Sequence, residues 1–404
     1  MAFYEENPQA IVRADVVVCI PTLNEVESIA RTTEQVDKGL TEHFPDLKCA
    51  IINSDNHSAD GTREEFFAAP GKIPRLYVST APGVRGKGHN LRNFFEKARE
   101  LSPRALVVVE ADVKNLAPVW IRNLALPILK GAGYACPLYV RHKYEATLTS
   151  SIIYPLIRCL YGRRVRQANV GDCAFSPKLL DLYLNPPLWN ASVESFGIDI
   201  WMSNIALAAR VPVVQAFMGV PKIHRVKDPY AHLTVLFREA VSTIFDLMAV
   251  YHDFWAQVKW SKPTALSGTD LQEMETPLPV DINTARLHER FIQGFDRFYP
   301  TWEQVFGQMV VPKLQEIRSM DFQHFSFPSQ TWATILFDAA AAYSRMSAPE
   351  KDNLLEALLP LYLGRVLSFV KKTERMSLQQ AEEYIENECM IFEENKPYII
   401  KVWN

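Results

Sequence analysis

Two acidic residues end an apolar run in the first third of the chain. Glu110 and Asp112 close the sequence VVVEAD, Val107–Asp112. Side chains alternate along a strand, so an acid-x-acid pair at its end places both carboxylates on one side. Two neighbouring carboxylates repel each other unless a cation or a proton lies between them. A divalent ion would remove that repulsion and could hold a nucleotide diphosphate, although two solvated acids at a strand end are a common alternative.

A later segment, Val220–Tyr230, supplies a histidine and an arginine, His224 and Arg225. A neutral imidazole is a suitable further ligand for a metal already held by a carboxylate, and an arginine could offset phosphate charge. Asp199, in the sequence SFGIDIW, could bond the hydroxyls of a sugar. Taken alone, His224 is more often a loop histidine and Asp199 more often a helix cap.

A glycine-rich loop, APGVRGKGHN, spans residues 81–90 and contains Arg85 and Lys87. Glycines let the backbone approach a diphosphate closely, and the two cations could neutralise it. The loop follows a late strand, so its position fits neither a dinucleotide fingerprint nor a Walker loop. A flexible basic loop is the simpler alternative.

Two more polar loops follow the first two apolar runs: PTLNE, Pro21–Glu25, and SDNHSADGT, Ser54–Thr62. The backbone of the first could grip a base or a ribose, and Glu25 could bond ribose hydroxyls, although a helix cap explains this loop at least as well. Asp55 could read a nucleotide base or act structurally. For Asp60, a turn and cap is the better interpretation.

These loops need elements that bring them to one edge of a sheet. Four largely apolar runs have strand length: Asp15–Ile20, Cys49–Ser54, Arg75–Thr80 and Ala105–Asp112. Amphipathic segments lie between them at Glu25–Gly39 and His89–Ala98. This alternation predicts an α/β fold with parallel strands, in which ligands bind beyond the carboxyl ends of the strands.

From about Ala231 the pattern of apolar residues changes: long stretches have the period of a helix, and almost no runs resemble strands. Ser261–Thr284 contains Pro and Thr residues and reads as a linker or surface loop. Four amphipathic helices are expected after it: Ala285–Phe306, Gln330–Met346, Lys351–Thr373 and Leu378–Glu394. We therefore predict two domains, an α/β domain at 1–230 and an α-helical C-terminal domain at 231–404, with a role for the helices in structure or in forming a homo-oligomer.

Composition agrees with a globular protein of about two domains. The chain has 404 residues, is 48% hydrophobic and carries a formal net charge of −3, so no general basic field exists to hold nucleic acid. The longest apolar stretches that we identified are too short or too interrupted for a membrane span. Six scattered cysteines show no metal-finger spacing and predict buried thiols in a reducing compartment. With no signal-peptide pattern at the start of the sequence, we expect a cytoplasmic protein.

The order of these motifs resembles the retaining GT-A glycosyltransferases, most closely the mannosylglycerate and glucosylglycerate synthase family. The resemblance covers most of Val16–His232 and depends on the order PTLNE, Asp after the second strand, GKG, EAD, FGID and HR. It implies a Rossmann-like GT-A domain that binds a nucleotide sugar and a divalent metal, Mg²⁺ or Mn²⁺.

For the donor, the resemblance implies that Lys87 contacts the phosphates and that Asp112 and His224 bind the metal. The nucleoside contacts that it implies are those of Pro21, Leu23, Glu25, Asp55 and, at the ribose, Glu110.

For the reaction, the resemblance implies that Asp199 binds the transferred sugar, with Lys87 and Arg225 also in catalytic roles. Arg141 matches the segment that binds the glycerate carboxylate, with Thr149 and Gly171 lining the same acceptor pocket. Two departures from the family pattern, EAD in place of DAD and Phe196 in place of Trp, put the ribose contact and the sugar preference in question.

The sequence thus predicts a hexosyltransferase that moves mannose or glucose from GDP-mannose, GDP-glucose or UDP-glucose to a small carboxylate such as D-glycerate. Two alternatives remain open. A lipid-directed glycosyltransferase, for example one that charges a polyprenyl phosphate, suits the PTLNE start equally well. A non-catalytic nucleotide-sugar-binding protein would bind the donor without turnover. A nucleotidyltransferase fits less well, because its glycine-rich loop should follow the first strand.

Overall fold

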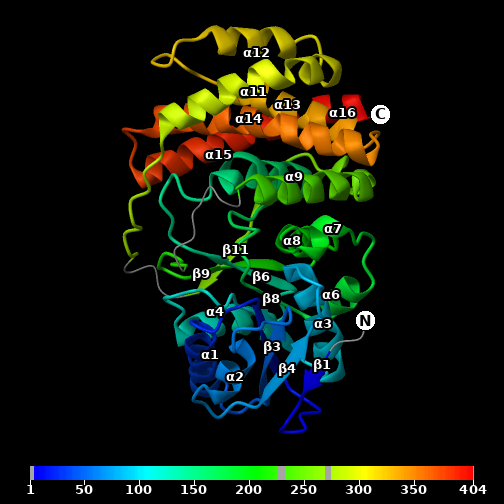
Figure 1. Cartoon of the computed structure of the whole chain (residues 1–404), viewed down its shortest axis with the longest axis vertical. Coiled ribbons are helices and arrows are strands. Elements are labelled where there is room, and N and C mark those ends of the chain that lie inside the picture. The colour runs from blue at the N-terminus through cyan, green and yellow to red at the C-terminus, as the bar shows by residue number, and fades with distance from the viewer. Residues whose placement is uncertain (1–3, 225–232, 269–273, 404) are drawn as a thin grey trace. The chain divides into compact units, whose positions relative to one another are not determined.

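The computed structural model describes residues 4–224, 233–268 and 274–403, which form two compact units (Figure 1). Unit 1 consists of Met1–Arg141, Gln167–Ala231 and Thr264–Pro277, and unit 2 of His142–Arg166, His232–Pro263 and Leu278–Asn404. Each unit therefore combines stretches that lie far apart in the sequence. The prediction placed one boundary at residue 230. Relative to that boundary, residues 142–166 belong to unit 2 and residues 264–277 belong to unit 1.

Within the described residues, nine strands form one mixed sheet in unit 1, in the order β1-β4-β3-β2-β5-β8-β6-β9-β11. Strands β1 and β8 are antiparallel to their neighbours and all other pairs are parallel. The strands are β1 (Tyr4–Glu6), β2 (Val16–Thr22), β3 (Cys49–Asp55), β4 (Arg75–Ser79), β5 (Ala105–Val108), β6 (Tyr134–Leu138), β8 (Cys173–Phe175), β9 (Val213–Phe217) and β11 (Ala265–Gly268). The predicted α/β class and the four predicted parallel strands are confirmed.

The central strands are apolar because both faces of the sheet are covered. Every residue of β2, β3, β4 and β5 is buried. In register, Val18 of β2 lies between Ile51 of β3 and Val107 of β5. A strand covered on both faces shows no alternation of apolar and polar residues, and this explains the continuous runs in the sequence.

Helices cover the two faces of this sheet. Val36 of α1 and Ile121 and Leu124 of α4 join Val18 in one hydrophobic cluster, so α1 and α4 pack on the same face. Ala174 of β8 belongs to that cluster. Phe175 follows it in the strand and therefore points to the other face, where its ring lies 5.7 Å from that of Phe95 in α3. The helices of unit 1 are α1 (Ile29–His43), α2 (Thr62–Ala68), α3 (Lys87–Glu100), α4 (Pro118–Leu129), α6 (Pro177–Leu184), α7 (Ala191–Glu194) and α8 (Ile198–Ala208).

Unit 2 is mostly helical, apart from a short parallel pair formed by β7 (Arg163–Arg164) and β10 (Lys262–Pro263). The four predicted C-terminal helices are confirmed as α11, α13, α14 and α15. Capping boxes of Ser347 with Glu350 and of Ser377 with Gln380 fix the starts of α14 and α15. The helical elements are η1 (Thr149–Ile153), α5 (Tyr154–Tyr161), α9 (Leu233–Val250), α10 (His252–Trp255), α11 (Thr284–Val305), α12 (Val310–Ser319), α13 (Ser329–Tyr343), α14 (Ala348–Thr373), α15 (Leu378–Glu394) and α16 (Lys396–Trp403).

Helix α14 is the one helix among the described residues that is long and apolar enough to cross a membrane. Most of its apolar window is buried inside unit 2, as in the core helix of a soluble protein. A Cβ added to Gly294 of α11 would lie 2.1 Å from Pro360 of α14, so glycine is what allows α11 to approach so closely. Arg365 of α14 is buried and forms an ion pair with Glu388 of α15.

The expectation that Ser261–Thr284 is a linker or surface loop is wrong for part of this stretch. Residues Ala265–Gly268 of this stretch form β11, which pairs in parallel with β9 at the edge of the unit 1 sheet. A four-residue edge strand is too short to show a period, and its partner lies about fifty residues earlier in the chain. Sequence pattern alone therefore gives no sign of it.

The six cysteines are all buried and unpaired, as expected. A reducing, cytoplasmic location and an oligomer formed through the helices of unit 2 remain predictions.

Candidate functional site

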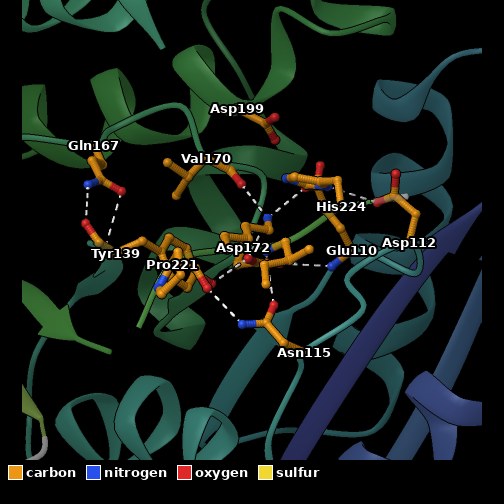
Figure 2. A network of polar contacts seen from close by, with 12 residues as sticks. Glu110, Asp112, Asn115, Tyr139, Gln167, Val170, Asp172, Asp199, Pro221 and His224 are labelled. Atoms are coloured by element: carbon orange, nitrogen blue, oxygen red, sulfur yellow. Dashed lines mark hydrogen bonds and ion pairs between the residues drawn. The ribbon is translucent and has the colours of Figure 1, made fainter. Parts of the chain in front are cut away.

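The candidate site lies in unit 1, where segments that follow the strands bring acidic and basic side chains together (Figure 2). Strand β5 ends at Val108, two residues earlier than Glu110, so the two acids do not share the side of a strand as expected. Glu110 and Asp112 nevertheless face one point. One ligand atom from each of Glu110, Asp112 and His224 lies within 4.8 Å of the others.

These three side chains fit a divalent cation. The Nδ1 atom of His224 lies 3.3 Å from the Oδ1 atom of Asp112. Carboxylates are ligands that suit Mn²⁺ and Mg²⁺, an imidazole is a common ligand of divalent transition metals, and Asp112 itself is buried. The sequence-based expectation of a divalent metal at Asp112 and His224 is therefore supported by a built donor set, to which Glu110 is a third contributor.

Glu110 is held between two lysines. Its Oε1 accepts from the Nζ of Lys87 at 2.9 Å, and its Oε2 accepts from the Nζ of Lys222 at 2.7 Å. Burial alone would raise the pKa of Glu110, but the charges of Lys222 and Lys87 outweigh burial and hold its pKa well below the usual range. Glu110 is therefore ionised at neutral pH.

Lys87 also reaches Asp199. It is the first residue of α3, and its Nζ donates to Oδ2 of Asp199 at 2.8 Å. Burial works to lower the pKa of Lys87, yet the charges of Asp199 and Glu110 raise it. Asp199 lies in the first turn of α8, and burial, followed by the charge of Glu110, raises its pKa above the ordinary value. Three residues predicted for donor binding or catalysis thus form one connected group.

Sequence reasoning missed Lys222. This side chain is 1% exposed and donates to Oε2 of Glu110, to the carbonyl of Val170 at 2.8 Å and to Oδ2 of Asp172 at 2.6 Å. In the segment VPKIHR, only the histidine and the arginine are predicted to take part in the site. The available signal was an isolated lysine between apolar neighbours, which is a weak one because most lysines in loops face solvent.

Asp172 connects this network to the backbone. Its Oδ1 accepts from the amide of Glu110 at 2.8 Å, and its Oδ2 accepts from the hydroxyl of Tyr139 at 2.6 Å. Burial and the charge of Asp172 raise the pKa of Tyr139, so this hydroxyl stays a donor. The orientation of Glu110 is therefore set by Asp172 through its main chain and by two lysines through its side chain.

Arg141, predicted to bind an acceptor carboxylate, stands next to the same network. Its Nε donates to Oε1 of Gln167 at 3.1 Å, and Nε2 of Gln167 donates to the carbonyl of Tyr139 at 2.8 Å. Gly171 has a φ of +83°, and a Cβ there would lie 2.2 Å from Oε1 of Glu110, so only glycine leaves room for that carboxylate. The backbone at Gly171 therefore lies against the carboxylate of Glu110.

Two other predicted residues are not placed at this site. Thr149 begins η1 in unit 2, and its role in the acceptor pocket stays a prediction. Arg225 lies outside the described residues, and its catalytic role likewise stays a prediction.

The predicted nucleoside residues lie around the carboxyl ends of β2 and β3. Pro21 is buried within β2, Leu23 is exposed and Glu25 is buried, where its Oε2 accepts from the hydroxyl of Ser28 at 2.7 Å. Asp60 accepts from the amide of Thr62, which agrees with the predicted turn, while the N-cap of α2 is Gly61.

Asp55 has a structural role beyond the predicted contact with a base. It is fully buried, and its two oxygens accept from the hydroxyls of Thr22 at 2.6 Å and Tyr77 at 2.8 Å and from the amide and hydroxyl of Ser58, both at 2.6 Å. It therefore ties the loop after β3 to β2 and β4. The contact with a base stays a prediction.

Residues 17–185 match the model of glycosyl transferase family 2. This match covers less than half of the chain. Together with the mixed sheet, whose two faces are covered by helices, and the acid cluster beyond β5, it supports the GT-A fold that the sequence resemblance implied.

Among solved structures, the chain is similar to glucosyl-3-phosphoglycerate synthase from Mycobacterium tuberculosis. Its complex with Mn²⁺, uridine diphosphate and glucosyl-3-phosphoglycerate is 20% identical, with a TM-score of 0.44 over 58% of this chain and 79% of that chain. Its complex with Mg²⁺ and uridine diphosphate is 19% identical, with a TM-score of 0.43 and the same coverage. No curated protein sequence matches the chain.

Proposed function

We propose that this protein is a metal-dependent, retaining hexosyltransferase that moves mannose or glucose from a nucleotide diphosphate sugar to a small hydroxy acid such as D-glycerate. One observation carries the proposal. Lys87, at the first residue of α3, bonds both Glu110 of the metal-binding cluster and Asp199. A cation for phosphate, a metal site and a carboxylate suited to sugar hydroxyls therefore meet at one point.

Lys87 is suited to contact the donor diphosphate. The first turn of a helix offers free backbone N–H groups and a partial positive charge, which favour an anion. An ammonium has three N–H donors, so Lys87 could bond a phosphate oxygen while it keeps Glu110 and Asp199. Its raised pKa keeps it charged at neutral pH.

Asp112 and His224, with Glu110 beside them, would hold the metal. A divalent ion bound there would supply the charge that stabilises a leaving diphosphate. Glu110, already bonded by two lysines, would contribute mainly negative charge to the site, whereas Asp112 and His224 are the better direct ligands.

In the proposed reaction, the acceptor hydroxyl oxygen forms a bond to the anomeric carbon while the bond from that carbon to the phosphate oxygen breaks. The hydroxyl proton passes to the departing phosphate on the same face of the sugar, so the configuration is retained. Asp199 would hold the sugar hydroxyls and keep the donor oriented. Glu110 and Asp199 are both ion-paired with Lys87, which makes either of them a poor covalent nucleophile.

The proposed acceptor carries a carboxylate. Arg141 would bind its carboxylate, because a guanidinium is a planar donor that matches a carboxylate well. Thr149, Gly171 and Arg225 are proposed to complete the acceptor and phosphate contacts.

The direct test is to incubate the protein with GDP-mannose, GDP-glucose or UDP-glucose, each with D-glycerate or 3-phosphoglycerate and with Mn²⁺ or Mg²⁺. Nucleotide release and product mass report turnover. Asp112→Ala should reduce the rate at least about 100-fold, because metal stabilisation of a leaving group is worth several kcal/mol. Asp181→Ala, which removes an exposed acid on α6, is the matched control and should leave the rate unchanged.

The outcomes separate the alternatives. Full activity of Asp112→Ala would refute the metal assignment. Donor binding with no product in any mixture would support the non-catalytic nucleotide-sugar-binding protein. Transfer to a polyprenyl phosphate, detected as product that partitions into organic solvent, would support the lipid-directed enzyme.

A further inference from the structure

The two metal-binding segments of unit 1 are paired with each other. Val113, which follows Asp112, forms an antiparallel bridge with His224. The amide of Lys114 donates to the carbonyl of Ile223 at 2.7 Å. The residues that bear the two proposed metal ligands are thus held side by side by a very short piece of β-pairing.

Asn115 extends this pairing with its side chain. Its Nδ2 donates to the carbonyl of Pro221 at 2.7 Å, and its Oδ1 accepts from the amide of Ile223 at 2.9 Å (Figure 2). A side-chain amide offers one donor edge and one acceptor, as a backbone peptide does, so Asn115 acts as an additional rung of the pairing. Aspartate lacks the donor, and leucine lacks both groups.

The two bonds of Asn115 lie on either side of Lys222. The backbone at Pro221 and Ile223 is fixed, and the side chain between them therefore enters the network of Glu110 and Asp172. His224 follows directly. Its side chain is 42% exposed, so packing contributes little to its position and the backbone pairing contributes more.

We propose that Asn115 is a positioning residue: it sets the backbone of Pro221–His224 so that His224 meets Asp112 at the metal and Lys222 meets Glu110. This inference rests on the metal site of the proposed function. Residues that orient metal ligands from behind typically change metal affinity 10- to 100-fold when they are replaced. We expect a loss of about that size when Asn115 loses both bonds.

The test measures metal binding without turnover. Free Mn²⁺ is titrated into the whole protein, with no donor or acceptor present, and followed by the electron paramagnetic resonance signal of unbound Mn²⁺. Asn115→Leu should raise the Kd for Mn²⁺ about 10- to 100-fold. In the same variant, hydrogen exchange of the peptide that contains the Ile223 amide should become faster, because this amide loses its acceptor.

Asn7→Leu is a matched control. Asn7 also donates from Nδ2 to a carbonyl, that of Ile11 at 2.9 Å, and accepts from the same residue's amide at 2.8 Å, but it lies near the N-terminus in a loop that carries no proposed ligand. It should leave the Kd for Mn²⁺ unchanged. If Asn115→Leu does not yield folded protein, Asn115→Ser, which replaces the carboxamide with a shorter hydroxyl, is measured by the same criterion.

Asp112→Ala separates failure of this inference from failure of the proposed function. If Asp112→Ala weakens Mn²⁺ binding but Asn115→Leu binds as the unsubstituted protein does, the positioning role is refuted and the metal site stands. If neither substitution changes the Kd, the metal is not bound here and both proposals fall.

Discussion

Lys222 is a buried cation that pairs with two carboxylates of the candidate site, and its replacement by methionine tests its role. Methionine has nearly the same length and keeps the packing, but it removes the charge and all three hydrogen bonds. Burial works to lower the pKa of Lys222, yet the charges of Asp172 and Glu110 raise it, so the lysine is charged at neutral pH. After the substitution, Asp172 is left as a buried carboxylate without its cation.

The expected cost follows from which charges stay behind. The side chains of Lys222 and Asp172 are 1% and 2% exposed, so water cannot readily replace the lost partner. Removing one member of a buried ion pair destabilises a protein by about 3–5 kcal/mol, because the other charge remains uncompensated. Glu110 adds less, since Lys87 still bonds its other oxygen. We therefore expect Lys222→Met to lower the free energy of unfolding of unit 1 by about 3–5 kcal/mol.

A double-mutant cycle adds a second substitution, Asp172→Asn. It removes the buried negative charge that Lys222→Met leaves without a partner, and it keeps an oxygen that can accept from the amide of Glu110. In the Lys222→Met background it should restore about 2 kcal/mol, because an uncharged amide costs less to bury than a carboxylate. Lys130→Met, at an exposed lysine of unit 1, should cost less than about 0.5 kcal/mol.

The assay must report on unit 1 alone, since a chain with two units need not unfold in one step. Hydrogen exchange of peptides from β5 and β8, measured over a range of urea concentrations, gives the free energy of unfolding of that unit. A cost below about 1 kcal/mol for Lys222→Met, or a double variant that is less stable than the single one, would refute the reasoning.

Two further outcomes follow from the pKa shifts. Because burial, followed by the charge of Glu110, raises the pKa of Asp199, its ion pair with Lys87 should be lost on acidification above the ordinary Asp value of about 4. Donor binding should therefore begin to weaken on acidification while the pH is still above about 4, and Asp199→Asn should not show this weakening. The same pH dependence in both proteins would contradict the assignment. Burial lowers the pKa of Lys396 to about 8, so between pH 8 and about 10.5 the unfolded state binds more protons than the folded state, and stability should rise with pH by about 3 kcal/mol relative to Lys396→Met. The stability of unit 2 would be measured by chemical denaturation at each pH. If it changes with pH by the same amount in the unsubstituted protein and in Lys396→Met, the prediction is refuted.

The parts of the fold that could be predicted are those with a local cause. The four buried strands appear in the sequence as apolar runs, and β2 ends within two residues of its predicted end. The helices of unit 2 appear as amphipathic stripes, and α15 has the predicted bounds of Leu378–Glu394, with a capping box at its start. What failed was β11, whose existence depends on an edge of β9 that a local pattern cannot reveal.

The site was predictable to the extent that its residues follow strands. Lys87 comes soon after a predicted strand and Glu110 and Asp112 close another, and a sheet with parallel central strands brings such residues to one edge. Lys222 and Asn115 depend instead on which loops meet, and neither charge nor spacing indicates that in one sequence.

The segment Pro221–His224 shows why Lys222 and Asn115 belong together. Lys222 and His224 are separated by one residue, so in an extended segment both side chains point to the same side. A slip of one residue in the pairing with Val113 would turn both away from the site at once. Asn115 bonds the backbone on either side of Lys222, and a slipped pairing would lose both bonds. The same amide therefore favours the one register in which a buried cation reaches Glu110 and an imidazole reaches Asp112, so that two functional contacts depend on a residue that bears no charge.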